Sequence, residues 1–258
     1  MTTHLRRTAA LFDLVAPEYD QHVPFFSAYA QRFVPWLGVA PHHDVLDIGT
    51  GRGALSRQAE EIGAHVVGID VSMEMLARGA GARCLMDAQQ LGFRSGCFDV
   101  AMGAFSIHLL PDPPTGVAEA VRVLRPGGIF GVAFSGRTST PQWDFYHDVL
   151  RRYSVHACGE PRLPPVVPFG DPHEVLASVG LVDIDVTECE IHVRVVDSES
   201  FLRGELAHGY RSLFDVIPPE PRRQMEAELR ERLDEMCAAG GIVLDRIAVF
   251  AKGSTRET

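Results

Sequence analysis

The chain has 258 residues, a formal net charge of −10, 46% hydrophobic residues and 22% charged residues. This length and composition are those of a globular protein with a full hydrophobic core, and they exclude collagen-like, coiled-coil and wholly disordered chains. The acidic balance argues against nucleic acid as a partner, because phosphate binding requires a basic surface.

Strands and helices alternate through the first half of the chain. Apolar residues that recur every three or four positions predict helices, and short apolar runs bounded by turn residues predict buried strands. In chain order, the expected elements are a helix at 24–37, a strand at 45–48, a helix at 54–62, a strand at 65–69, a helix at 73–80, strands at 84–86 and 98–105, a helix at 115–124 and a strand at 129–134. This alternation predicts a parallel, doubly wound α/β sheet.

The second half of the chain follows a different pattern, although no linker separates it from the first. Residues 139–169 are rich in proline and aromatic residues. The elements expected after them are a helix at 172–179, a strand at 182–196, helices at 198–216 and 219–238, and a last strand at 242–251. We therefore expect a single domain, 1–258. Its core would comprise about 41–136 and 172–254, and its cap segments about 1–40, 139–169 and 198–216.

Cysteine usage and hydropathy limit the cellular setting. The five cysteines are Cys84, Cys97, Cys158, Cys189 and Cys237. No two lie close enough for a Cys-x-x-Cys metal motif, and an odd, scattered set is typical of reduced thiols in a cytoplasm. No apolar run approaches the roughly 18 residues that a membrane helix needs. The sequence therefore predicts a soluble, cytoplasmic protein with no metal site and no membrane partner.

A glycine-rich turn follows the first predicted strand. Gly49, Gly51 and Gly53 alternate with other residues, and a helix is expected directly after them. Glycines allow a tight turn and the close approach of a ligand. Asp70 ends the next strand, 21 residues after Gly49, where a carboxylate can accept both hydroxyls of a ribose. Through Ala54 this pattern also satisfies the dinucleotide fingerprint, so on its own it leaves a nicotinamide oxidoreductase open.

An ordered set of further motifs separates these alternatives. Met86–Ala88 ends the third predicted strand, Phe98–Met102 opens the fourth, Ser106–Asp112 follows it, and Leu124–Gly128 precedes the fifth. With the glycine turn, this set resembles the class I S-adenosylmethionine-dependent methyltransferases, and within them the ubiquinone/menaquinone-biosynthesis-type group of small-molecule methyltransferases. The resemblance is strong over 45–134. It implies a Rossmann-like, mostly parallel, seven-stranded doubly wound sheet with a helical cap, and S-adenosyl-L-methionine as the cofactor.

The resemblance also implies which residues surround the methionine half of the cofactor. They are Tyr19, Asp47, Gly49, Thr50, Gly51 and Ala104. Asp47 would hold the ammonium group, and Tyr19 would close over the cofactor. Glycine N–H groups of the turn would bind the carboxylate.

A second group of residues would surround the adenosine half. It consists of Asp70, Val71, Met75, Asp87 and Ala88. By resemblance, Asp70 would bind the ribose hydroxyls, and Val71 and Met75 would flank the adenine. Asp87 would accept a hydrogen bond from the exocyclic amine of the adenine, with Ala88 beside it.

His108 is the first candidate for a general base, which is required only if the acceptor enters protonated. It follows the fourth strand, where the acceptor should meet the methyl group, and histidine titrates near neutral pH. A role in shaping the pocket is equally open. The weaker candidates are His22, His147, His208 and Tyr146.

The cap segments suggest what the acceptor is. Aromatic residues are frequent in 139–169, and the helix at 198–216 carries one apolar face. That face comprises Leu202, Leu206, Tyr210, Leu213 and Phe214. We expect the cap to enclose an apolar pocket, although ordinary packing on the sheet explains most of these residues as well.

The sequence thus predicts transfer of a methyl group to a small apolar or aromatic metabolite, with oxygen as the favoured acceptor atom, in bacterial specialised or quinone-type biosynthesis. The main alternative is a fold relative that binds S-adenosylmethionine but catalyses a non-methylating reaction such as cyclisation. A nicotinamide oxidoreductase and a non-catalytic binding protein are the others. Asp112-Pro113-Pro114 resembles a motif of enzymes that methylate nucleic-acid or protein amines. In those enzymes it directly follows the fourth strand, a place that Ser106–His108 hold here.

Overall fold

The computed structural model describes residues 2–136, 141–159, 167–208 and 211–257. Its centre is a seven-stranded sheet in the order β3-β2-β1-β4-β5-β7-β6. The strands are β1 (Asp44–Ile48), β2 (His65–Asp70), β3 (Ala82–Leu85), β4 (Phe98–Ala104), β5 (Leu124–Ser135), β6 (Val182–Val195) and β7 (Ile242–Ser254). Strands β1 to β5 pair in parallel, whereas β7 runs antiparallel to both β5 and β6. The expected mostly parallel, seven-stranded sheet is confirmed.

Helices cover both faces of this sheet. They are α2 (Phe25–Trp36) and α3 (Ala54–Ile62) on one face, and α5 (Pro113–Arg122) and α7 (Pro172–Ser178) on the other. Successive side chains of a strand point to opposite faces, so each strand supplies apolar residues to both layers. On the first face, the ring centroid of Phe33 in α2 lies 4.9 Å from that of Phe250 in β7. On the second face, Phe130 of β5 is fully buried.

Two further helices lie at the carboxyl end of β2. Helix α4 (Met73–Ala77) follows this strand, and α1 (Thr3–Val15) packs on α4. Asp13 of α1 accepts hydrogen bonds from Ser72 Oγ at 2.6 Å and from the Glu74 amide at 3.1 Å. A side chain of α1 therefore joins the first turn of α4, where free amides need acceptors.

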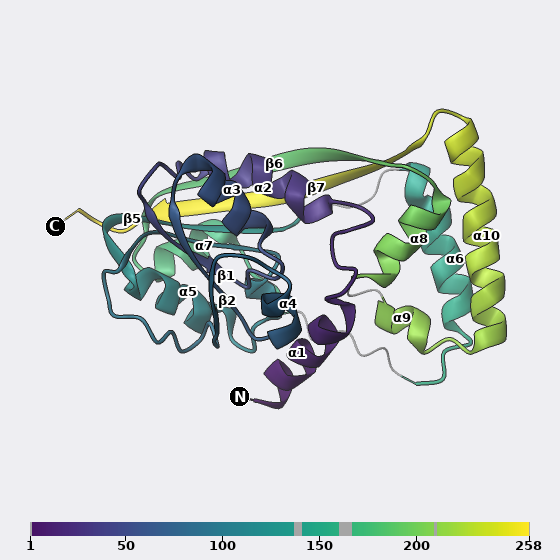
Figure 1. The fold of residues 1–258 in the computed structure, drawn as a ribbon, viewed down its shortest axis with the longest axis horizontal. Helices are drawn as coiled ribbons and strands as arrows, with labels where there is room; N and C mark the ends of the chain where they lie inside the picture. Colours follow the sequence, from purple (N-terminus) through teal and green to yellow (C-terminus); the bar gives the residue numbers. More distant parts are fainter. Residues whose placement is uncertain (1, 137–140, 160–166, 209–210, 258) are drawn as a thin grey trace.

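The remaining helices form a lobe beyond one end of the sheet. They are α6 (Asp144–Ser154), α8 (Ser198–Leu206), α9 (Arg211–Asp215) and α10 (Pro219–Ala238). Figure 1 shows the long strands β6 and β7 reaching from the sheet to this lobe. Two short 3-10 turns, η1 (Ile107–Leu109) and η2 (Pro141–Trp143), complete the elements. Among the residues that the structure describes, no helix is long and apolar enough to cross a membrane.

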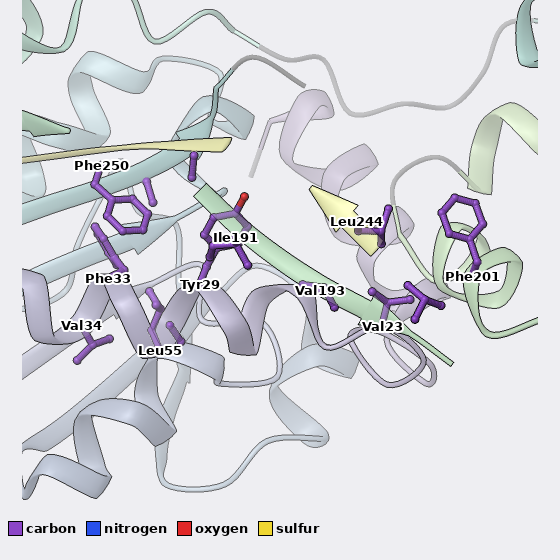
Figure 2. Close-up of a cluster of buried hydrophobic side chains, with 14 of the residues drawn as sticks. Val23, Tyr29, Phe33, Val34, Leu55, Ile191, Val193, Phe201, Leu244 and Phe250 are labelled. Carbon is purple, nitrogen blue, oxygen red and sulfur yellow. The ribbon is translucent and has the colours of Figure 1, made fainter. Parts of the chain in front are cut away.

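The lobe and the sheet share one hydrophobic core. A contiguous cluster of buried side chains runs from Phe33 and Phe250 through Ile191 and Val193 to Phe201 of α8 (Figure 2). Within the lobe, the ring of Trp143 stacks on that of Phe201 at 5.2 Å between centroids. The lobe is thus anchored to the sheet by packing as well as by two strands.

Most of the elements expected from the sequence are present, with three differences. The helices α1 and α6 were not expected, because the apolar residues of α1 are spaced among arginines and α6 lies in a proline-rich stretch. The segment 198–216 divides into α8 and α9, and Tyr210 lies outside the described residues. Helix α2, which the sequence placed with the cap, packs on the sheet, whereas α10 packs with α6 and α8.

Candidate active site

Two adjoining pockets lie at the carboxyl ends of β1, β2 and β4. The first has a volume of about 250 Å³ and the second about 80 Å³. Both are lined by Tyr19, Gly49, Gly51, Ala104 and Phe105. The two pockets therefore form one elongated cleft with these residues at its junction. Open parallel sheets bind their ligands at this edge.

Nearly all the cofactor-binding residues predicted from the sequence line this cleft. Asp47 and Thr50 lie in the first pocket. The second pocket contains Asp70, Val71, Met75 and Ala88. Asp87 lines neither pocket, and its Oδ1 accepts a hydrogen bond from the Gln89 amide at 2.9 Å.

The glycine turn needs its glycines for two different reasons. A Cβ atom on Gly49 would lie 2.3 Å from Cβ of Ser106, so this position must stay bare for the turn to pack on the segment after β4. At Gly51, with φ of +54°, a Cβ atom would meet nothing within 4 Å. Gly51 lines both pockets, so any side chain there would point into space that a ligand needs.

The amides of the turn are already bonded within the protein. The Thr50 amide donates to the Ile69 carbonyl at 2.9 Å, the Gly51 amide to Asp70 Oδ2 at 2.9 Å, and the Gly53 amide to the Thr50 carbonyl at 2.7 Å. The expectation that glycine N–H groups bind a ligand carboxylate is therefore corrected for Gly51 and Gly53. The turn is rigid instead, because its own backbone and Asp70 hold it.

Asp47 presents one unpartnered oxygen to the first pocket. It is 1% exposed, and its Oδ2 accepts from Thr50 Oγ1 at 2.7 Å, Ser56 Oγ at 2.6 Å and the Ser56 amide at 3.1 Å. Its Oδ1 is buried and has no hydrogen-bond partner among the described residues. Burial raises the pKa of Asp47. A buried carboxylate oxygen is costly to leave unpaired, so this site favours a ligand that brings a donor or a positive charge.

Asp70 joins the glycine turn to the second pocket. Its Oδ2 accepts from the Gly51 amide at 2.9 Å, and its Oδ1 accepts from the Ser72 amide at 2.8 Å. Burial raises the pKa of Asp70, and the charge of Asp47 adds to the effect. The Val71 amide is a further backbone donor to this carboxylate, and the lone pairs that remain can accept from a ligand diol.

Comparisons with known proteins agree with this geometry. The methyltransferase domain family matches residues 46–132. Nocamycin O-methyltransferase of Saccharothrix syringae is 30% identical to this chain, and the alignment covers 95% of this chain and 98% of that protein. The chain belongs to the class I S-adenosylmethionine-dependent methyltransferases. The cofactor of this methyltransferase is S-adenosylmethionine, and the unpartnered oxygen of Asp47 fits its ammonium group.

Two other comparisons give the range of the family. Demethylmenaquinone methyltransferase of Renibacterium salmoninarum is 34% identical to this chain, and the alignment covers 56% of this chain and 65% of that protein. The solved structure of phosphoethanolamine N-methyltransferase 2 of Haemonchus contortus, in complex with S-adenosylmethionine, has a TM-score of 0.53 and 18% identity, and it covers 89% of this chain and 52% of that one. The second comparison establishes the shared fold alone.

Aromatic rings surround the junction of the two pockets of the methyltransferase. Tyr19 stacks on Phe26 with centroids 5.1 Å apart and meets the edge of Phe12 at 6.1 Å. Burial, with Asp20 and Asp70 nearby, raises the pKa of Tyr19 well above its usual value. Phe105 adopts a φ of +56°, which bulky residues rarely do, and its ring lies 5.4 Å from that of Phe26. Of these rings, only Tyr19 was singled out from the sequence as a site residue.

Two of the candidate bases, His108 and His208, lie in different surroundings, although neither of them lines either pocket. His108 lies on η1, is half-buried, and lines neither pocket. Burial lowers its pKa. His208 follows α8, and its ring centroid lies 5.1 Å from that of Tyr19 and 5.5 Å from that of Phe26. Its Nε2 is buried without a partner among the described residues, and burial lowers the pKa of His208 to about 4.

The other polar candidates have structural partners. His22 Nε2 lies 3.1 Å from Glu18 Oε2 at the surface, and the Tyr146 hydroxyl donates to Glu205 Oε2 at 2.5 Å inside the lobe. Asp112 is the N-cap of α5, where its side chain accepts from the Thr115 amide at 3.4 Å. The Asp-Pro-Pro sequence of the methyltransferase therefore begins a helix.

Proposed function

We propose that this methyltransferase transfers the methyl group of S-adenosylmethionine to a hydroxyl oxygen of a small apolar or aromatic metabolite of the cytoplasm. The observation that carries the proposal is the cluster of three aromatic side chains, Tyr19, Phe26 and Phe105, at the junction of the two pockets. Flat apolar ligands pack well on such surfaces. The match to an O-methyltransferase over nearly its full length supports oxygen as the acceptor atom.

The proposal places the cofactor along the whole cleft, within a single domain that spans the chain. The first pocket would take the methionine end, with its ammonium group on Asp47 Oδ1. The second pocket would take the adenosine, with Asp70 on the ribose hydroxyls and Val71 and Met75 beside the adenine. Asp87 would reach the adenine only at its outer edge. When bound, the cofactor supplies an electrophilic methyl group, and the protein supplies alignment.

The lobe would contribute the acceptor site and a proton acceptor. Nε2 of His208 is the best-placed basic atom, because it has no partner and its ring contacts Tyr19 at the junction. The imidazole donates a hydrogen bond to the backbone of Gly204, and since Nε2 has no partner, this donor is Nδ1–H and the lone pair of Nε2 is free. His108, favoured by the sequence, would then help to shape the acceptor site.

The experiment that tests the function is a product assay with methyl-labelled S-adenosylmethionine and a panel of phenols, naphthols and aliphatic alcohols. We expect label in an O-methylated product and an equal amount of S-adenosylhomocysteine. A converted acceptor with no label and no S-adenosylhomocysteine would instead mean a non-methylating reaction. Label on nitrogen or carbon would contradict the choice of oxygen.

Replacement of His208 by phenylalanine should separate proton transfer from packing. The ring of phenylalanine keeps the contacts with Tyr19 and Phe26 but cannot accept a proton. We expect kcat to fall about 100-fold at neutral pH, with unchanged affinity for the cofactor. The loss should shrink at a pH above the pKa of the acceptor hydroxyl, because an ionised acceptor needs no base.

His108→Phe is the matched control, since it changes the same residue type at a position outside the aromatic cluster of Tyr19 and Phe26 that His208 contacts. We expect it to lower kcat less than His208→Phe does. The opposite order, with the pH rescue appearing in His108→Phe, would return the role of base to His108.

A further inference from the structure

Three arginines line the first pocket of this acidic chain, and their partners differ. They are Arg52, Arg57 and Arg78. Arg78 forms an ion pair with Glu74, and Arg57 Nη1 donates to the Arg52 carbonyl at 2.7 Å. For Arg52 and Arg57, no carboxylate lies within ion-pair distance among the residues that the structure describes, and of these two only Arg52 is half-buried. Burial and the two neighbouring arginines lower the pKa of the Arg52 guanidinium, so this group favours the arrival of an anion.

The acidic side chains of the pocket form no ion pair with Arg52, although the charge of Asp20 acts on it from a distance. The carboxylate of Asp20 accepts from the Phe26 amide at 2.9 Å, the Ser27 amide at 3.1 Å and the Ser27 hydroxyl at 2.8 Å. Asp47 is held by Thr50 and Ser56, and only its Oδ1 is left unpartnered. A half-buried cation and a buried carboxylate oxygen, neither with an opposite charge bonded to it, thus face one pocket of about 250 Å³. This pair of charges complements a zwitterionic α-amino acid.

The glycine turn offers no alternative anion site in its bonded amides. The N–H groups of Thr50, Gly51 and Gly53 all donate within the protein. The side chain of Arg52, which belongs to the same turn, lines the first pocket as a charged donor. Nη1 of Arg52 also donates to the Tyr19 carbonyl at 3.0 Å, so one side chain touches both the pocket and the segment that carries Tyr19.

We infer that Arg52 binds the carboxylate of the methionine moiety of the cofactor and, through the Tyr19 carbonyl, links cofactor binding to the position of Tyr19 over the junction. The inference rests on the cofactor placement proposed above and is independent of the acceptor. A guanidinium presents two parallel donors to a carboxylate, which a backbone amide cannot do.

A paired deletion in protein and ligand tests the contact. The probes are S-adenosylhomocysteine and its decarboxylated analogue, S-adenosyl-3-thiopropylamine, measured by calorimetric titration. The wild-type protein should bind S-adenosylhomocysteine about 10- to 100-fold more tightly than the analogue, as expected for hydrogen bonds between charged groups. Arg52→Met should lose this preference by weakening S-adenosylhomocysteine alone. Arg52→Lys, which keeps the charge but lacks the two parallel donors of a guanidinium, should retain part of this preference.

Two arginine variants serve as controls. Arg78→Met removes a cation of the same pocket that Glu74 already pairs, and Arg94→Met removes an exposed arginine that lines neither pocket. Both should keep the preference for the carboxylate. An equal loss in Arg78→Met would mean that the summed charge of the pocket, and not Arg52, recognises the carboxylate.

Hydrogen exchange provides a readout of the link to Tyr19. S-adenosylhomocysteine should slow exchange of the amides of residues 18–21 in the wild-type protein, and the decarboxylated analogue should slow it less. If Arg52→Met weakens both ligands equally, or keeps the full preference, the inference is overturned while the cofactor placement stands. If the wild-type protein binds neither ligand, the cofactor placement itself fails.

Discussion

We expect replacement of Gly51 by valine to abolish binding of S-adenosylmethionine, and we expect the fold to tolerate this change as well as the same change at Gly38. A Cβ atom on Gly51 meets no protein atom within 4 Å, so the branched side chain extends into the cleft that both pockets share. The expected loss of affinity exceeds about 1,000-fold, because methyl groups would occupy space required by the ligand and no protein group can yield to relieve the overlap. Calorimetric titration with S-adenosylmethionine measures it directly.

Gly38 provides the matched control for backbone strain. It has a φ of +80°, is exposed after α2, and likewise has nothing within 4 Å of an added Cβ atom. Both substitutions therefore place valine in the left-handed region, at a cost of about 1–2 kcal/mol each. Thermal unfolding should report similar destabilisation for the two variants, while only Gly51→Val loses the cofactor. Cofactor binding by Gly51→Val at wild-type affinity would remove the turn from the binding site.

The second large effect is expected at Asp70. Asp70→Ala removes the acceptor for the Gly51 amide and the acceptor for the Ser72 amide, and it removes the carboxylate lone pairs left for the ribose diol. Two hydrogen bonds to a charged group together correspond to about a 1,000-fold change in affinity. We expect a loss of this size for S-adenosylhomocysteine, measured by titration. Unchanged affinity would place the ribose elsewhere.

Asp87→Ala is the informative comparison, because Asp87 also follows a strand at this edge of the sheet, two residues after the end of β3, but lines neither pocket. We expect a loss of about 10-fold at most, as for one partly exposed hydrogen bond. A loss as large as that of Asp70→Ala would mean that the adenine extends further along β3 than the cleft does.

The affinity for the cofactor should depend on pH through the carboxyl groups of Asp70 and Asp47. Burial raises the pKa of Asp70 and of Asp47 above the usual range for aspartate. A raised pKa means that the folded protein binds these protons more tightly than the unfolded chain does, so ionisation of both groups opposes folding as the pH rises. The cofactor prefers the ionised carboxylates. Its affinity should therefore fall as the pH is lowered through the raised pKa values, and this fall should be smaller in Asp70→Asn.

The alternation of strands and helices could be predicted because its causes are local. A buried parallel strand is a short apolar run, and in the helix after it apolar residues recur every three to four positions. Each of β1 to β5 can therefore be predicted from its own segment of the sequence. The same holds for the glycine turn and for Asp70, which the sequence places at consecutive strand ends. Parallel pairing then brings these ends to one edge, and the second pocket forms where it was expected.

The details that decide the chemistry depend on contacts between distant segments. The Gly51 amide is bonded because Asp70 lies across from it on β2, and Oδ1 of Asp47 is unpartnered because Thr50 and Ser56 bond only to Oδ2. No pattern in the sequence predicts which oxygen or amide has no hydrogen-bond partner. Finding these atoms requires the positions of all neighbouring donors and acceptors.

The fold class, the family and the edge of the sheet proposed for the cofactor can all be derived from local patterns in the chain. The groups that complete the proposed site depend on contacts between distant segments. His208 is about one hundred residues from His108 along the chain, yet it is His208 whose ring meets Tyr19, because β6 carries the chain out to the lobe and α8 brings it back. Arg52 lies inside the glycine motif, but only the donors and acceptors around it distinguish a ligand-binding arginine from a solvated one. Local patterns fix elements, whereas long-range packing fixes which polar atoms remain for a ligand.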